Sequence, residues 1–242
     1  MAFPSTLIDI GRIPELRGVR DDGDAIVSGA MTTHHDVMHD QLVRRYAPLI
    51  AQATATVGDP QVRHRGTFGG SLAHADPAGD LGAVALALGC EFVVSGPAGE
   101  RRLAAADFFV DYLTTALAPA ELLTAVRVPK PGDGWSSHYQ KFNRVAQAWS
   151  IVGVGALVRL GGTSITEARV GLTNMGPTPL RGDRHRGGAF RRTGNRGRCH
   201  RCGVACGGGH PRAERPVRRV GLPGSPRLCP DRQGSPGRDR GH

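Results

Sequence analysis

The sequence predicts an α+β protein with two folded regions and a basic C-terminal tail, and three observations carry this prediction. Helical patterns and locally paired strands are interspersed over the first half of the chain. Strand patterns then follow one another through tight turns, as in an antiparallel sheet. From residue 181 onward neither periodicity is present, and arginine, glycine and proline dominate. The 242 residues are enough for a sizeable hydrophobic core.

The first elements are read from apolar spacing. Residues 5–11, STLIDIG, alternate like a strand, and residues 24–30, DAIVSGA, read as a second strand. A helix is expected to begin after Thr32 or Thr33 and to end near Asp40. A longer helix is expected next, because apolar side chains recur every three or four positions, at Tyr46, Leu49, Ile50, Ala53 and Val57. The Gly-Asp-Pro that follows is expected to end it.

The remaining elements are one helix and a series of paired strands. Asp80 is placed to cap a helix over residues 81–88, LGAVALAL, which Gly89 closes. Residues 91–103 read as a hairpin with a Gly-Pro-Ala-Gly turn. Four further strand patterns complete the two regions, at residues 121–129, 137–144, 150–160 and 161–172.

Charge and cysteine are concentrated at the C-terminal end. Residues 1–180 carry 15 Lys and Arg against 17 Asp and Glu, whereas residues 181–242 carry 16 against 4. The net charge of +10 therefore belongs to the tail. Cys90 is the one cysteine before residue 199, which indicates a reducing compartment without disulfides. Neither a membrane-length apolar run nor a signal-peptide pattern is found, so a cytoplasmic protein without a membrane span is expected.

The tail offers a hypothesis of its own. Its arginines could bind nucleic acid through charge alone, with no specific sequence read. A zinc site is the other possibility, although its ligands would bracket no foldable segment. The candidate ligands are Cys199, Cys202, Cys206, His200 and His210.

Other polar clusters in the body favour structural roles. His34, His35 and His39, with two nearby aspartates, could form a metal cluster, but a solvated helix face is the favoured interpretation. Cys90 is interpreted as a small core residue and not as a nucleophile. The absence of GxSxG, P-loop and HExxH motifs leaves hydrolase and NTPase functions without support.

One stretch, RHRGTFGGSLAHADPAGD at residues 63–80, places bare backbone beside hydroxyls, cations and acids. Gly69 and Gly70 have no Cβ to block the approach of an anion to the backbone amides. The hydroxyls of Thr67 and Ser71 add donors, nearby arginines add charge, and Asp80 can accept a hydrogen bond from a ribose hydroxyl. The residue types alone leave two readings open, an ordinary turn and an anion-binding cradle.

This stretch resembles the second flavin-binding motif of the FAD-binding (medium) subunits of molybdenum hydroxylases, the family of the carbon monoxide dehydrogenase and xanthine dehydrogenase flavoproteins. The family's T-I-G-G is T-F-G-G here. Further landmarks, such as STLIDIGRIPEL, ADFFVDYLTTAL, YQKFNR and GLTNMGPTPLR, extend the resemblance over residues 5–181. It implies an incomplete PCMH-type FAD-binding domain (residues 1–131) and the start of a small antiparallel-sheet C-terminal domain (132–181). The composition of residues 182–242, rich in arginine, glycine and proline, predicts a disordered tail.

The resemblance also implies a cofactor, FAD, and assigns residues to it. Thr67, Gly69, Gly70 and Ser71 would contact the FAD pyrophosphate. Asp80 would contact the ribose or the adjacent phosphate.

Three further positions are implied near the flavin ring. Leu123, or its neighbour Leu122, matches a family position there. Lys141 matches another, where a cation can stabilise negative charge on the reduced ring. Trp149 either packs on the isoalloxazine or is a core aromatic residue.

By the same resemblance the chain is one subunit of an oxidoreductase complex. Electrons would reach its FAD from [2Fe–2S] clusters of a small partner subunit, and a large molybdopterin-binding subunit would oxidise the substrate. No catalytic residue and no metal ligand is implied in this chain. The single cysteine of the body fits this division, since iron–sulfur clusters need several.

Two departures from the family pattern lead to an alternative. The other half of the family's pyrophosphate cradle is an A-G-G-x-S motif on an N-terminal segment of roughly 50 residues, whose amides would approach the phosphates. That segment is expected to be missing here, and the residues from 182 onward are expected to be translated out of frame. Sequencing the locus tests this expectation. The alternative is therefore a non-functional fragment whose basic tail binds nucleic acid adventitiously.

Overall fold

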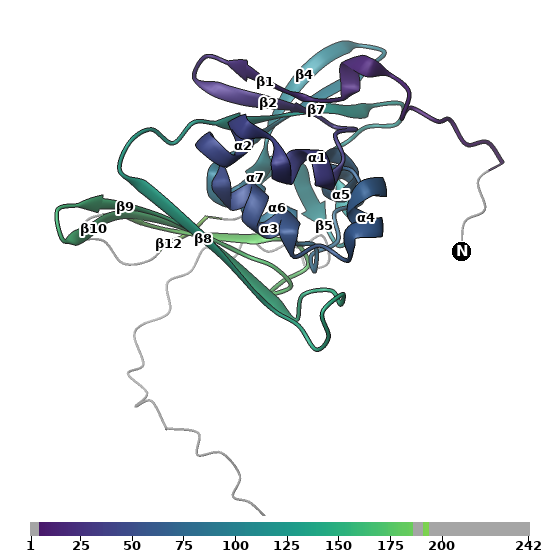
Figure 1. The fold of residues 1–242 in the computed structure, drawn as a ribbon. Helices are drawn as coiled ribbons and strands as arrows, with labels where there is room; N and C mark the ends of the chain where they lie inside the picture. Colours follow the sequence, from purple (N-terminus) through teal and green to yellow (C-terminus); the bar gives the residue numbers. More distant parts are fainter. Residues whose placement is uncertain (1–4, 186–190, 194–242) are drawn as a thin grey trace, which may run out of the picture. The chain divides into compact units, whose positions relative to one another are not determined.

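The computed structural model describes residues 5–185 and 191–193 of the chain. These residues form two five-stranded antiparallel sheets, and short helices lie between the sheets (Figure 1). The mixture of helices and antiparallel sheets confirms the predicted α+β class. The helices are α1 (His34–His39), α2 (Gln41–Tyr46), α3 (Pro48–Ala55), α4 (Pro60–Arg65), α5 (Phe68–His74), α6 (Asp80–Leu88) and α7 (Ala105–Phe108), with a 3₁₀ turn at Pro14–Leu16.

The first sheet has the strand order β1-β2-β7-β3-β4. Its second strand is buried at every position, because neighbours cover both of its faces. The predicted hairpin is confirmed as the antiparallel pair β3 and β4, and a small separate ribbon pairs β5 with β6. The strands are β1 (Val19–Asp22), β2 (Ala25–Gly29), β3 (Glu91–Gly96), β4 (Gly99–Ala104), β5 (Phe109–Asp111), β6 (Thr114–Thr115) and β7 (Leu122–Pro129).

The start of the chain differs from the prediction. Residues 5–11 form no strand, and the side chains of Leu7 and Ile8 are 86% and 82% exposed. The first strand is β1, which has the polar sequence Val-Arg-Asp-Asp and lies at the edge of its sheet. Edge strands tolerate charged side chains, so apolar alternation does not reveal them.

The helices begin and end at recognisable caps. The predicted first helix is confirmed as α1, with the Thr33 hydroxyl accepting a hydrogen bond from the Asp36 amide at 3.1 Å. The single long helix expected next is wrong: Tyr46 ends α2, and Pro48 starts α3. Asp59 then caps α4. This helix was not predicted, because Gly-Asp-Pro was interpreted only as the end of the preceding helix. In the described part of the chain no helix has the length and apolar character of a membrane span.

The second sheet has the order β12-β11-β10-β9-β8. The chain was expected to lose its pattern from Arg181, but backbone pairing with β10 continues to His185. Apart from Arg191–Thr193, the tail after His185, including its cysteines, lies outside the described residues. The strands are β8 (Trp135–Phe142), β9 (Val152–Gly161), β10 (Ser164–Leu172), β11 (Leu180–His185) and β12 (Arg191–Thr193).

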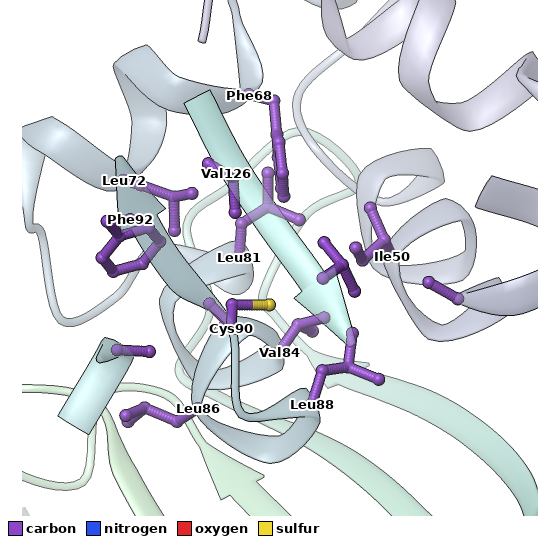
Figure 2. Packing of buried hydrophobic residues seen from close by; sticks show 14 of the residues in the cluster. Ile50, Phe68, Leu72, Leu81, Val84, Leu86, Leu88, Cys90, Phe92 and Val126 are labelled. Atoms are coloured by element: carbon purple, nitrogen blue, oxygen red, sulfur yellow. The ribbon is translucent and has the colours of Figure 1, made fainter. Parts of the chain in front are cut away.

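Every residue of helix α6 is buried. Its residues Leu81, Val84, Leu86 and Leu88 belong to the hydrophobic cluster shown in Figure 2. The second sheet packs closely on α6, since a Cβ on Gly171 of β10 would lie 2.0 Å from the Ala83 carbonyl oxygen. Cys90 follows α6 and is 1% exposed, and burial raises the pKa of its thiol to about 12. It is therefore the core residue that the sequence predicted and not a nucleophile.

Candidate functional site

Asp80, the first residue of α6, is the centre of a buried polar network. Gly79 is the N-cap of the helix, so the predicted capping role of Asp80 is wrong. The carboxylate accepts hydrogen bonds from the Tyr139 hydroxyl at 2.6 Å, from the Lys141 ammonium at 2.8 Å and from the Ser150 hydroxyl. The side chains of Lys141 and Asp80 are only 7% and 5% exposed. Three donors therefore satisfy a carboxylate that water scarcely reaches.

The donors come from the second sheet. Tyr139 and Lys141 are two residues apart on β8, so their side chains share one face of the strand. The side-chain oxygen of Gln52, on α3, accepts from the Tyr139 amide at 3.0 Å and so fixes this edge strand against the helices. Burial, followed by the charge of Asp80, raises the pKa of Tyr139 above its ordinary value. The phenol is therefore held as a protonated donor.

A cavity of about 310 Å³ opens beside this network. Asp76, Asp80 and Lys141 supply its charged groups, and the polar side chains are those of Ser71, His34, His74 and Gln147. The apolar part of its lining comes from the helices α4 and α6, the turn after α3, the strand β5 and the loop before β9. The residues are, in that order, Val62, Leu81, Val57, Phe109 and Trp149. The cavity is therefore largely apolar, with an ion pair in one wall.

The Gly-Gly motif forms the first turn of α5. The Thr67 hydroxyl caps this helix and accepts from the Gly70 amide at 3.2 Å. The Gly69 amide donates to the carbonyl oxygen of Ala30 at 2.9 Å, and the Ser71 amide donates to that of Thr67 at 3.1 Å. The amides that were expected to cradle a pyrophosphate thus already have acceptors within the protein.

The two glycines of the motif have different surroundings. A Cβ on Gly69 would lie 2.4 Å from the Cβ and 2.6 Å from the Cα of Ala30, so the close approach to the end of β2 requires glycine. Gly70 is exposed, and a Cβ there would meet only the Thr67 side chain within 4 Å. The first glycine is needed for packing against backbone, whereas a side chain at the second would press only on the Thr67 hydroxyl, at 2.6 Å.

The other predicted site residues do not all meet at the cavity. Ser71, Asp80 and Lys141 line it together, whereas Thr67 borders a neighbouring hollow. Leu123 lies in the core on β7, 7% exposed. Trp149 is not a core aromatic residue, since it lines the cavity and is 61% exposed.

His34 is a cavity residue that sequence reasoning placed on a solvated helix face. It is 3% exposed, its Nδ1 atom has no hydrogen-bond partner, and its ring lies against Gly66. Burial, together with the charge of Arg63, lowers its pKa to about 4. The one sequence signal that could have revealed it is its position, which places it one residue after the Thr33 cap and on the inner side of a short helix.

This buried histidine predicts a pH dependence of stability. The pKa of His34 is 6.5 in the unfolded chain and about 4 in the folded one. Between these pH values the imidazole is therefore protonated in the unfolded chain and neutral in the folded chain. The free energy of unfolding should therefore fall as pH falls through that window, with a slope of up to about one proton. Urea unfolding at several pH values in this range gives the free energy of unfolding as a function of pH. The slope of that free energy against pH should be smaller for His34→Gln than for the parent. An unchanged slope in that variant would contradict the prediction.

The neighbouring histidines form a stack at the surface. The ring of His35 lies 4.4 Å from that of His39 and 4.0 Å from that of His64, on α4. In residues 5–185 and 191–193 no group of three His, Cys, Asp or Glu side chains has the arrangement of a metal site.

Comparison with known proteins identifies both regions. Residues 1–131 match the family model of the FAD binding domain in molybdopterin dehydrogenase. Residues 137–185 match the CO dehydrogenase flavoprotein C-terminal domain. The two matches meet near KPGDGW, where the first sheet ends and the second begins.

Individual relatives agree with the family models. The chain is 41% identical to the carbon monoxide dehydrogenase medium chain of Hydrogenophaga pseudoflava over 74% of its own length and 63% of the relative's. It is 34% identical to the glyceraldehyde dehydrogenase medium chain of Sulfolobus acidocaldarius, with coverage of 74% and 63%. The chain thus spans less than two thirds of the length of these relatives.

A solved structure shows the same fold. The carbon monoxide dehydrogenase of Hydrogenophaga pseudoflava that lacks the Mo-pyranopterin moiety superposes with a TM-score of 0.73 and 41% identity. The match covers 74% of this chain and 63% of the solved one. This chain therefore belongs to the family of FAD-binding domains of molybdopterin dehydrogenases and continues into the CO dehydrogenase flavoprotein C-terminal domain.

Proposed function

We propose that this chain binds FAD with the flavin ring in the cavity beside Asp80 and Lys141, and that it serves as the electron-transfer flavoprotein of a molybdenum hydroxylase complex. The observation that carries the proposal is the buried Lys141–Asp80 pair in the wall of a largely apolar cavity. The chain's membership of an FAD-binding family supports it.

The cavity has the chemistry that a flavin ring requires. Such a ring has an apolar benzenoid edge and a polar edge with carbonyl oxygens and an N–H group. Phe109, Leu81 and Trp149 offer apolar surface, while Lys141 and Asp80 offer a donor and an acceptor. A volume of about 310 Å³ is at the lower end for ligand pockets, so it suits the ring and not the whole dinucleotide.

Lys141 is the residue whose charge would stabilise the reduced flavin ring. Bound flavin supplies one- and two-electron transfer. The Lys141 ammonium has three donors, of which Asp80 and the Thr56 carbonyl oxygen, at 3.1 Å, use two. One N–H therefore remains for the ring, where its charge would stabilise the added electrons. Tyr139 and Ser150 hold Asp80, and Asp80 holds Lys141.

The partners and the substrate are part of the proposal. Electrons would come from the [2Fe–2S] clusters of a small partner subunit, after oxidation of the substrate on a large molybdopterin-binding subunit. In the described residues the one cysteine, Cys90, is buried, so this chain offers no set of cluster ligands there. The relatives are named for carbon monoxide and for glyceraldehyde, so the substrate would be determined by the large subunit.

Flavin retention by the full chain tests the proposal. The 242-residue protein, mixed with FAD and desalted, should retain flavin with quenched fluorescence. Lys141→Met should weaken flavin binding about tenfold or more and lower the flavin reduction potential, because a cation beside the ring is lost. Lys130→Met is the matched control, because Lys130 pairs with Asp21 outside the cavity.

Three measurements separate the outcomes. Circular dichroism confirms that each variant is folded, absorbance gives the flavin content, and a redox titration gives the potential. Loss of all flavin on desalting the folded parent would overturn the proposal. Equal affinity and potential in parent and Lys141→Met would overturn the role of Lys141.

A further inference from the structure

A pocket of about 390 Å³ lies beside the linker that joins the two sheets. Its walls come from helices α2, α3 and α6, from the linker after β7, and from strands β8 and β9. In the part of the chain that the structure describes, this pocket and the flavin cavity share no lining residue. We call it the junction pocket, defined by Arg45, Tyr46, Lys130, Asp133, Trp135 and Ser137.

The junction pocket has two aromatic rings in its wall, from different elements of the fold. Tyr46 is the last residue of α2, and Trp135 is the first residue of β8. Leu88 and Leu157 add aliphatic surface beside the rings. Flat apolar surface of this kind favours a ligand with an aromatic ring.

Of the two cations in the wall, Arg45 is the one that remains for a ligand. The Lys130 ammonium donates to the two carboxylate oxygens of Asp21, at 2.7 and 2.8 Å, and to the Gly23 carbonyl oxygen at 2.8 Å, so its three N–H groups are used. Arg45 has no carboxylate within ion-pair distance among the described residues. Its guanidinium carbon lies 5.0 Å from the centre of the Tyr46 ring, at the aromatic wall. A guanidinium group can bind a carboxylate through two parallel hydrogen bonds.

Two further polar groups narrow the chemistry of the ligand. The Ser137 hydroxyl is buried and has no hydrogen-bond partner within the described residues, which costs free energy unless a bound group supplies one. Asp133, in the linker, is exposed and adds a negative charge to the lining. Repulsion by this carboxylate disfavours a ligand with two negative charges, such as a phosphate, and leaves a singly charged anion as the better match for Arg45.

We propose that the junction pocket binds a small aromatic carboxylate. The ring of the ligand lies against Tyr46 and Trp135, its carboxylate pairs with the guanidinium group of Arg45, and the Ser137 hydroxyl donates to a ligand oxygen. A volume of about 390 Å³ suits one or two fused rings with a single carboxylate. This site is independent of the proposed function, because no residue that lines the flavin cavity takes part in it.

Calorimetry on the full chain with 2-naphthoate as the probe tests this inference. The parent should bind 2-naphthoate at a single site. Arg45→Met should weaken this binding about tenfold or more, as expected for lost charged hydrogen bonds. Arg45→Lys should recover part of the loss, because lysine retains the charge and not the bidentate fork. The neutral analogue 2-naphthylmethanol, which keeps the ring without the charge, should bind the parent and Arg45→Met equally well.

Two more variants sharpen the assignment. Arg44→Met is the matched control, because Arg44 is the preceding exposed residue of α2 and its guanidinium group donates to the Met38 carbonyl oxygen at 2.9 Å, outside the pocket lining. It should leave the affinity for 2-naphthoate unchanged. Ser137→Ala should weaken 2-naphthoate about threefold, as expected for one lost hydrogen bond, without lowering the stability of the free protein.

Each outcome has a definite meaning once circular dichroism has confirmed that every variant is folded. A parent that binds no 2-naphthoate, or an equal effect of Arg45→Met and Arg44→Met, would overturn the junction pocket as the site. Affinity that is unchanged in Arg45→Met but lost in Lys141→Met would place the probe in the flavin cavity and would also overturn it. Flavin retention is measured separately, so the proposed function stands or fails on its own result.

Discussion

Asp80→Ala is expected to lower the free energy of unfolding by about 3–5 kcal/mol, because it leaves the Lys141 ammonium buried without its counter-ion. The two side chains are 5% and 7% exposed, so solvent does not screen their interaction to any large extent. The hydroxyls of Tyr139 and Ser150 lose their acceptor in the same step. Urea unfolding of the full chain, followed by tryptophan fluorescence, measures this loss.

A double-mutant cycle separates the pair from its surroundings. Asp80→Ala/Lys141→Met removes both charges, so it should be less destabilised than the sum of the single variants, with a coupling of about 1–3 kcal/mol. Asp133→Ala removes an exposed aspartate in the linker between the sheets and should change stability by less than about 0.5 kcal/mol. A loss in Asp80→Ala no larger than in this control would contradict the account of a buried ion pair.

The local parts of the fold could be predicted because short-range patterns encode them. The Thr33 cap, the left-handed Gly89 that ends α6 and the hairpin of β3 and β4 each depend on a few consecutive residues. Strand β1 escaped prediction because an edge strand needs no apolar alternation. Helix α4 escaped because its start signal, Asp59 before Pro60, also serves as the end signal of the preceding segment.

The site could be predicted only in part, for a similar reason. Resemblance to the family selected Asp80 and Lys141, and the structure brings them into contact across 61 residues of sequence. No local pattern indicates that Tyr139 and Ser150 complete the network from 59 and 70 residues away. The hydrogen bond from the Gly69 amide to Ala30 likewise depends on tertiary structure, because Ala30 lies at the end of β2, far from Gly69 in the sequence.

Gly69→Ala and Gly70→Ala, adjacent substitutions with the same chemistry, are expected to have very different effects. In Gly69→Ala the new Cβ would lie 2.4–2.6 Å from Cβ and Cα of Ala30, and this backbone cannot move without disturbing β2. The cost should be about 3 kcal/mol, as for overpacking in a core. In Gly70→Ala the nearest atom is the rotatable Thr67 hydroxyl, at 2.6 Å. Its lost cap, about 1 kcal/mol, is offset by the higher helix propensity of alanine.

The same two variants test whether the Gly69–Gly70 turn contacts the phosphates of FAD. If the motif does not contact the ligand, Gly70→Ala should keep the FAD affinity of the parent within about twofold, because the new Cβ would meet only the Thr67 side chain within 4 Å. If the glycine amides hold the phosphates, the added methyl group at the exposed Gly70 should weaken FAD about tenfold or more without loss of stability. Measuring urea unfolding and FAD binding on both variants separates a glycine needed for packing from one needed for the ligand. A stable Gly69→Ala protein would contradict the packing role assigned to that glycine.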